Sequence, residues 1–178
     1  TTEIYTLSLH DALPICTFFR VIPLEFVEGS PDQALVQPYS LVLSETVSNR
    51  LFGTTDAIGE IVRFENQYDF TVTGVIKNYP YMHLKTEVIA SMVSLEKIRR
   101  PGILQEYDGW SYPTYLRLPA ETAVPEYESG IKELLLQFHY DQPFHLKPFN
   151  EIYYSPEVEN ESNTKHGNLL YNRILIAV

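Results

Sequence analysis

Cysteine and basic residues are both scarce in this sequence of 178 residues. The one cysteine, Cys16, has no partner for an internal disulfide and no second thiolate for a zinc site. Thirteen lysines and arginines stand against 23 aspartates and glutamates, and the formal net charge is -10 at pH 7. The basic residues are scattered, whereas phosphate binding depends on clustered ones, so we expect no nucleic-acid partner. An apolar run of about 18 residues, which would indicate a complete membrane span, is also missing.

Recognisable catalytic and cofactor-binding motifs are missing as well. The sequence contains no HExxH, no GxSxG, no GxGxxG and no phosphate loop that ends in Lys-Ser or Lys-Thr. Four histidines lack metal-ligand spacing, and we interpret them as ordinary surface or half-buried residues: His83, His139, His145 and His166. An acidic cluster could bind calcium weakly, but it lacks the EF-hand pattern and is interpreted as a solvated loop: Glu157, Glu159 and Glu161. We therefore predict no catalytic residue, no cofactor and no metal site.

The composition is that of a folded domain, because 44% of the residues are hydrophobic and 13% are aromatic. Its best-defined stretch is Ser40 to Ile76. A short apolar run predicts a strand over 41–43, and Ser44 is a candidate N-cap for a helix over 45–51. Gly53 suits the left-handed end of that helix, and Gly59 lies in the turn that follows. Two β-branched and aromatic runs, 61–64 and 70–75, then predict a hairpin around 65–67.

The rest of the chain predicts an α+β fold, with a mixed sheet and two to three packed helices. Val47, Leu51 and Phe52 are expected on one face of the first helix. A partly buried strand or bent segment is expected over 18–29, followed by a one-turn helix over 30–35 capped by Ser30. Further strands are expected over 87–91, 110–118 and 144–148, with 152–154 as an extension of the last. Two further helices are expected, one from Ser94 to Arg100 capped by Ser94 and one over 125–138 lying on a sheet.

The first fifteen residues are similar, residue for residue, to the translation of a common sequencing adapter. We interpret residues 1–16 as an artefact of that origin, with Cys16 at the junction; a genuine amphipathic segment is the alternative.

The remainder resembles the periplasmic core domain of MacB/FtsX/LolE-type ABC transporter permeases, especially those of Bacteroidetes. The matching segments read FFRVIPLEFVEGSPDQAL, VLSETVSNRLFG, AIGEIVRFENQYDFTVTGVIKNYPYMHLKTEV, YLRLPAETAVPEYESGIKELL and LKPFNEIYYSPEVENES. On this resemblance, residues 17–168 are a partial core domain truncated at both ends, and residues 169–178 begin a truncated transmembrane helix. Residues 18–84 and 110–168 are expected to form mainly its larger portion. Its structural signature is a set of cap and turn residues: Gly29, Ser44, Gly53, Gly59 and Gly74.

The resemblance implies a non-enzymatic role in an inner-membrane transporter. The domain would lie in the periplasm and couple ATP-driven conformational change to export, lipoprotein handling or signalling. Its implied partners are an ABC ATPase subunit, a second permease copy or homologue, and a periplasmic protein or lipoprotein. The alternative, from a different class, is an extracellular ligand- or glycan-binding module that uses the aromatic residues Trp110, Tyr112 and Tyr115.

Overall fold

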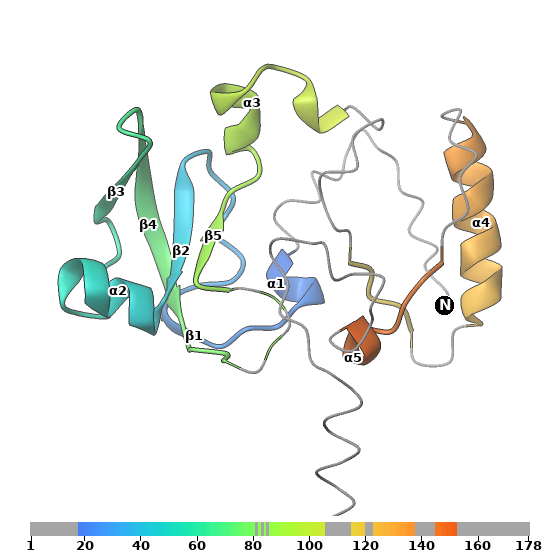
Figure 1. Cartoon of the computed structure of the whole chain (residues 1–178), viewed down its shortest axis with the longest axis horizontal. Helices are drawn as coiled ribbons and strands as arrows, with labels where there is room; N and C mark the ends of the chain where they lie inside the picture. The colour runs from blue at the N-terminus through green and yellow to red at the C-terminus, as the bar shows by residue number, and fades with distance from the viewer. Residues whose placement is uncertain are drawn as a thin grey trace, which may run out of the picture. The chain divides into compact units, whose positions relative to one another are not determined.

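The computed structural model of the chain describes residues 18–80, 82, 84, 86–105, 115–119, 123–137 and 145–152 (Figure 1). The chain divides into two compact units. The first contains Thr1–Asn78 and Thr86–Tyr115, and the second contains Tyr79–Lys85 and Leu116–Val178. This division differs from the expected one, which grouped residues 110–168 with the N-terminal part of the chain. Local patterns cannot reveal such a grouping, because it depends on contacts between distant segments.

The first unit is built on a mixed five-stranded sheet, as the α+β prediction requires. Its strands are β1 (Phe26–Gly29), β2 (Ser40–Ser44), β3 (Ile61–Phe64), β4 (Tyr68–Ile76) and β5 (Val88–Ala90). The order is β1-β4-β2-β5, and β3 also pairs with β4 (Figure 1). β2 and β4 run parallel, whereas the other pairs are antiparallel. The predicted α+β class is thereby confirmed.

β4 is the strand that the others share. Its first half pairs with β3, from Phe64 opposite Tyr68 to Ile61 opposite Thr71. Its second half pairs with β1 over residues 74–76, and β2 pairs with it over residues 71–76. One strand of nine residues therefore connects β1, β2 and β3 into a single sheet.

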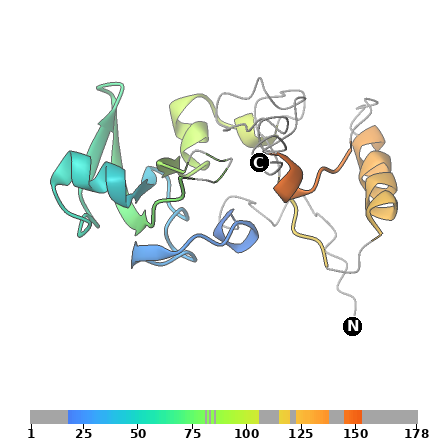
Figure 2. The same ribbon diagram turned by 60° about the horizontal axis from the view of Figure 1, so that its bottom comes forward.

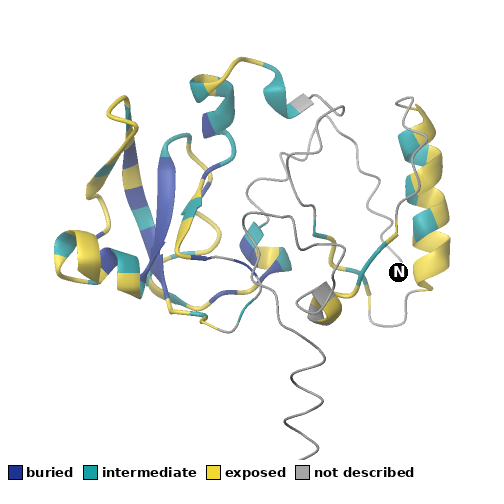
Figure 3. Ribbon diagram, viewed as in Figure 1, coloured by how far each residue is buried: buried dark blue, intermediate teal, exposed yellow. Residues whose placement is uncertain are grey.

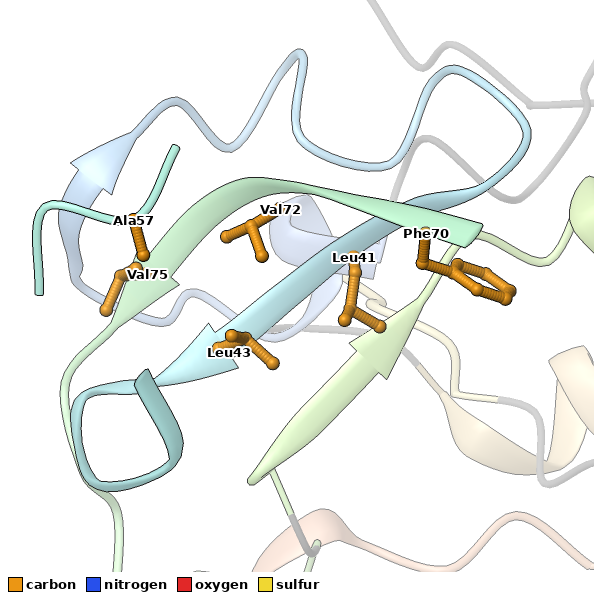
Figure 4. Packing of buried hydrophobic residues seen from close by; sticks show 6 residues of the cluster. All are labelled: Leu41, Leu43, Ala57, Phe70, Val72 and Val75. Atoms are coloured by element: carbon orange, nitrogen blue, oxygen red, sulfur yellow. The ribbon is translucent and has the colours of Figure 1, made fainter. Parts of the chain in front are cut away.

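The core lies around β2 and β4. All five residues of β2 are buried, which fits the uninterrupted apolar run of a strand covered on both faces (Figure 3). One hydrophobic cluster consists of Leu41, Leu43, Ala57, Phe70, Val72 and Val75 (Figure 4). These side chains come from β2, β4 and the connection before β3, so the core depends on segments that are distant in the sequence.

Helix α2 (Glu45–Phe52) follows β2 directly and contacts both β2 and β4 (Figure 2). Val47 and Phe52 pack against the core cluster, as predicted, but Leu51 is 50% exposed. Ser48, in contrast, is fully buried, and its hydroxyl donates to the Thr54 carbonyl at 2.7 Å. The helix is therefore rotated toward Ser48 and Phe52, which lie one turn apart on the same face. The prediction for Leu51 was wrong for this reason.

The predicted β3–β4 hairpin is confirmed. Glu65 and Asn66 both have positive φ, at 50° and 56°, and the Gln67 amide donates to the Phe64 carbonyl at 3.0 Å. Two consecutive positive φ values are what type I′ hairpin turns require, because their twist matches that of the strands. Asn tolerates this conformation better than most residues.

The loop over residues 30–39 is held against the sheet by hydroxyl groups from other segments. Thr73 donates to the Ala34 carbonyl, and Ser91 donates to the Leu35 carbonyl at 2.8 Å. The Ser94 hydroxyl accepts from the Tyr39 amide at 2.8 Å. Ser91 and Ser94 are each 2% exposed, so these buried hydroxyls find their partners in the loop backbone.

Two predicted helix starts were wrong in this region. Residues 30–35 form turns, in which the Ala34 amide donates to the Ser30 carbonyl, rather than a helix. Helix α3 (Ser94–Ile98) has Val93 at its N-cap, without a side-chain cap. Ser94 cannot serve as that cap because it is already helical and its hydroxyl is engaged with Tyr39. A short 3-10 helix, η2 (Ile103–Gln105), follows.

The segment over residues 18–29 is only partly a strand. Phe18–Val21 form the one-turn helix α1, and only Phe26–Gly29 pair as β1. The buried Phe19 ring meets the Phe26 ring edge to face, with centroids 4.8 Å apart. An aromatic pair thus places the helix beside the strand, a contact between residues seven apart that strand periodicity does not reveal.

The second unit contains helix α4 (Val124–Gln137), which agrees with the predicted helix, and helix α5 (Phe149–Ile152). Three expectations for the described residues from 115 onward were wrong: residues 115–118 and 145–148 form no strand, and Ile152 is helical. The described part of this unit also contains no strand for α4 to cover. Apolar alternation predicted strands here, but a strand also needs a partner for its backbone.

Truncation of a leucine should distinguish the core from the exposed side of α2. We expect Leu43→Ala to lower the free energy of unfolding by about 2–5 kcal/mol, because Leu43 is fully buried. Leu51→Ala, the matched control, should change it by less than about 1 kcal/mol because Leu51 is half exposed. Urea denaturation followed by circular dichroism measures both. Equal losses for the two variants would contradict the observed orientation of α2.

Candidate functional site

The described residues contain no group of three or more histidine, cysteine or acidic side chains that could hold a metal ion. Of the four histidines considered above, His145 is the one that the structure describes; its side chain is 84% exposed and its Nδ1 lies 3.7 Å from Glu128 Oε1. His83, His139, His166 and the acidic cluster over residues 157–161 lie outside the described residues. No catalytic constellation is assembled by the part of the chain that is described.

The candidate site is therefore the scaffold formed by the five signature residues. Gly29 and Gly74 are brought together, since they are register partners in the β1–β4 pair. Ser44 ends β2 opposite Ile76 of β4 and caps α2. Gly53 and Gly59 lie apart from that pair, in the connection from α2 to β3. That these five residues form a family signature stays a prediction.

Gly29 and Gly74 are required by close packing. A Cβ on Gly29, which has a φ of 88°, would lie 2.6 Å from the Thr73 carbonyl oxygen. A Cβ on Gly74 would lie 2.6 Å from Cε1 of the Phe26 ring. A side-chain Cβ essentially never lies this close to a non-bonded atom, so any side chain at either position must displace β1 from β4 or move the Phe26 ring.

The two ends of α2 are closed as the sequence predicted. The Ser44 hydroxyl accepts from the Val47 amide at 3.3 Å, which satisfies one of the free donors of the first turn. Gly53 has a φ of 74°, and its amide donates to the Asn49 carbonyl. The Gly59 amide then donates to the Val72 carbonyl at 2.8 Å, so the turn after the helix is fixed to β4. These bonds set the position of α2 over the sheet.

Sequence reasoning missed Asn78, which lies just after β4. Its side-chain oxygen accepts from the amide and from the hydroxyl of Thr46, at 3.1 and 2.9 Å. The backbone amide of Asn78 donates to Glu45 Oε2 at 3.3 Å. A second residue thus caps α2 from outside the helix, and the only signal for it in the sequence is an amide residue after a strand.

One exposed ion pair crosses the outer face of the hairpin. Arg63 Nε lies 2.6 Å from Asp69 Oδ1, and Arg63 Nη2 lies 2.9 Å from Asp69 Oδ2. The two residues are register partners, so the contact is a cross-strand pair with two parallel hydrogen bonds. The hydrogen bond from Arg63 lowers the pKa of Asp69, and the same bond raises the pKa of Arg63.

The aromatic residues of the alternative hypothesis receive no support as a stacking surface. Trp110 and Tyr112 lie outside the described residues, and Tyr115 is half-buried in a segment without regular structure. The strand that was to present them is therefore not observed in its described part.

The sequence matches the family model of the MacB-like periplasmic core domain over residues 12–134. No curated protein sequence matches the chain significantly. Among solved structures, a domain of a protein described as a permease from Porphyromonas gingivalis is similar with a TM-score of 0.56 and 19% identity, covering 75% of this chain and 65% of that one. The periplasmic region of MacB from Actinobacillus actinomycetemcomitans has a TM-score of 0.49 and 18% identity, covering 81% of this chain and 62% of that one. The chain thus spans less than two thirds of either solved protein.

The longest described helix has 14 residues. None of the helices in the described ranges is both long and apolar enough to cross a membrane.

Two glycines with nearly the same φ allow a test of the close packing between β1 and β4. Gly59→Ala should cost about 1 kcal/mol of unfolding free energy, because its φ is 90° but the space around it is open. Gly29→Ala should cost clearly more, since it adds the overlap with Thr73 to a φ of 88°. Chemical denaturation measures both variants. A loss for Gly29→Ala no larger than that for Gly59→Ala would show that β1 moves away freely.

The Arg63–Asp69 pair should give a small pH dependence of stability. Because the folded pKa of Asp69 is lowered, the contribution is complete above the ordinary carboxyl pKa of about 4 and is lost as pH falls through the lower folded value. A carboxyl-detected NMR titration should find Asp69 below the usual range. Arg63→Gln should return its pKa to that range, and an unchanged midpoint in this variant would exclude Arg63 as the cause.

Proposed function

Since this chain belongs to the MacB-like periplasmic core domain family, we propose that it works as the extracytoplasmic domain of an ABC transporter permease. In this role it is not itself catalytic. It couples the conformational change driven by ATP hydrolysis, on the other side of the membrane, to export, lipoprotein handling or signalling in the periplasm. The family match over residues 12–134 is the observation that carries this proposal.

The construction of the first unit supports a mechanical role. The central strand β2 is buried along its whole length and pairs on one side with β4, which in turn holds β1 and β3. Loops 30–39 and 53–60 are fixed to this sheet by hydrogen bonds to Thr73, Ser91 and Val72. Protein interiors packed in this way transmit displacement rather than absorb it. A body of this kind suits a domain that passes on motion generated elsewhere.

The proposed partners follow from the same role. An ABC ATPase subunit would act on this domain through the full-length permease, and a second permease copy or homologue would complete the transporter. A periplasmic protein or lipoprotein is the proposed contact on the outer side. We place the domain in the periplasm next to the inner membrane, with residues 17–168 as core domain, residues 169–178 as the start of a membrane helix and residues 1–16 as foreign sequence.

The proposal predicts that ATP moves this domain relative to the bilayer. In the full-length permease, reconstituted with its ATPase and with its own cysteines replaced by serine, a fluorophore would be attached at Gln67→Cys in the exposed hairpin turn or at Lys132→Cys on the exposed face of α4. Energy transfer to acceptor lipids should change when ATP is added and return after hydrolysis. An ATPase subunit that cannot bind nucleotide serves as the control and should abolish the change.

Two outcomes would overturn the proposal. The first is constant energy transfer from both label sites in a preparation that hydrolyses ATP. The second comes from the gene itself: a reading frame that ends shortly after Val178, with no membrane segments and no neighbouring ATPase gene, would leave no permease for this domain to serve.

A further inference from the structure

The chain leaves the first unit after Asn78 and returns to it at Thr86, and residues 79–85 belong to the second unit. Both ends of this excursion meet the same short segment, the junction between β2 and α2 formed by Ser44, Glu45 and Thr46. We call residues 44–46 the β2–α2 junction.

At the exit, Asn78 is bound to the junction by three hydrogen bonds. Its side-chain oxygen accepts from the Thr46 amide and hydroxyl, and its amide donates to Glu45 Oε2. The Thr46 amide is one of the first-turn donors that the helix itself cannot satisfy. Ser44 serves the Val47 amide, so α2 has one internal cap and one cap supplied by the exiting chain.

At the return, the connection is of a different kind. The Ser44 amide donates to the Glu87 carbonyl at 2.9 Å, which extends the β2–β5 pairing beyond Leu43 and Val88. Ser44 is 4% exposed, whereas Thr46 and Asn78 are exposed. The return is therefore a backbone ladder bond between the buried Ser44 and the partly exposed edge strand β5, and the exit is a small set of solvent-accessible hydrogen bonds that involve side chains.

We propose that displacement of residues 79–85 is passed to the sheet through the β2–α2 junction, and that the Asn78–Thr46 contact is the part of this connection that opens first. This inference rests on the proposed function. Side-chain hydrogen bonds open to water are individually weak, whereas the β2–β5 ladder is a continuous series of backbone bonds, so the Asn78 contact opens before the β2–β5 pairing does. When it opens, the first turn of α2 loses a cap. How well ordered the first turn of α2 is therefore depends on the position of residues 79–85.

The Asn78–Thr46 contact is tested first in the full chain, without transport. Insertion of two glycines after Pro80 loosens the excursion while leaving Asn78 in place. We expect it to speed hydrogen exchange of the Thr46 amide about fivefold, the loss equivalent to one net hydrogen bond. In the Asn78→Ala background the insertion should have no further effect. The Gly59 amide, which is bound to Val72, should exchange at the same rate in all variants.

Asn49→Ala is the matched control. Asn49 is an exposed asparagine of the same helix, and its side chain donates to the Glu45 carbonyl at 2.9 Å, so this variant also removes a hydrogen bond from α2. That bond lies within the helix and does not involve Asn78. In its background the insertion should still speed exchange at Thr46. An insertion that leaves Thr46 unchanged, or that acts equally with and without Asn78, would overturn the inference.

The labelled permease separates this inference from the proposed function. If the wild type responds to ATP, Asn78→Ala should reduce the response at Gln67→Cys by at least half, and Asn49→Ala should leave it intact. A full response in Asn78→Ala would refute the junction as the entry point and leave the proposed function standing. If the wild type itself does not respond, the proposed function fails, and the hydrogen-exchange result alone decides whether the Asn78–Thr46 contact responds to residues 79–85.

Discussion

The parallel pairing of β2 with β4 is the constraint on which the first unit depends. Two parallel neighbours need a long crossover, and here it contains α2, its closing turn and the whole of β3. Each part of that crossover must then be fixed in place. Ser44 and Asn78 fix the start of α2, and Gly59 fixes the turn that follows the helix to Val72. The polar contacts of this region are therefore consequences of one pairing between apolar strands.

Local chemistry predicted the structure well where neighbours in the sequence decide it. The cap at Ser44, the left-handed end at Gly53 and the hairpin around residues 65–67 all depend on residues a few positions apart, and all are observed. The burial of Ser48 in place of Leu51 was not predictable, because the rotation of α2 is set by the sheet beneath it. The strands expected over residues 110–118 and 144–148 failed, in their described parts, for a related reason: alternation records a preference for a half-buried surface, not the presence of a partner strand.

The candidate site shows the same division between local and non-local information. Gly29 and Gly74 were singled out separately, and only the register of β1 against β4 reveals that each excludes a side chain because of the other strand. Asn78 was missed entirely, since its partners Glu45 and Thr46 precede it by more than thirty residues. Family membership, in contrast, was recognisable from the order and spacing of quoted segments. The family match starts at residue 12, ahead of the range 17–168 that the resemblance covered, and it ends at residue 134, well before the end of that range.

The loop over residues 30–39 has a further consequence for how such a domain can diversify. Thr73, Ser91 and Ser94 hold this loop through its backbone, at the carbonyls of Ala34 and Leu35 and the amide of Tyr39. Bonds to the main chain do not depend on which side chains the loop carries. Exposed positions such as Pro31 and Gln33 can therefore be exchanged while the loop keeps its path. A protein built in this way can acquire a new outer surface without redesigning the sheet that supports it.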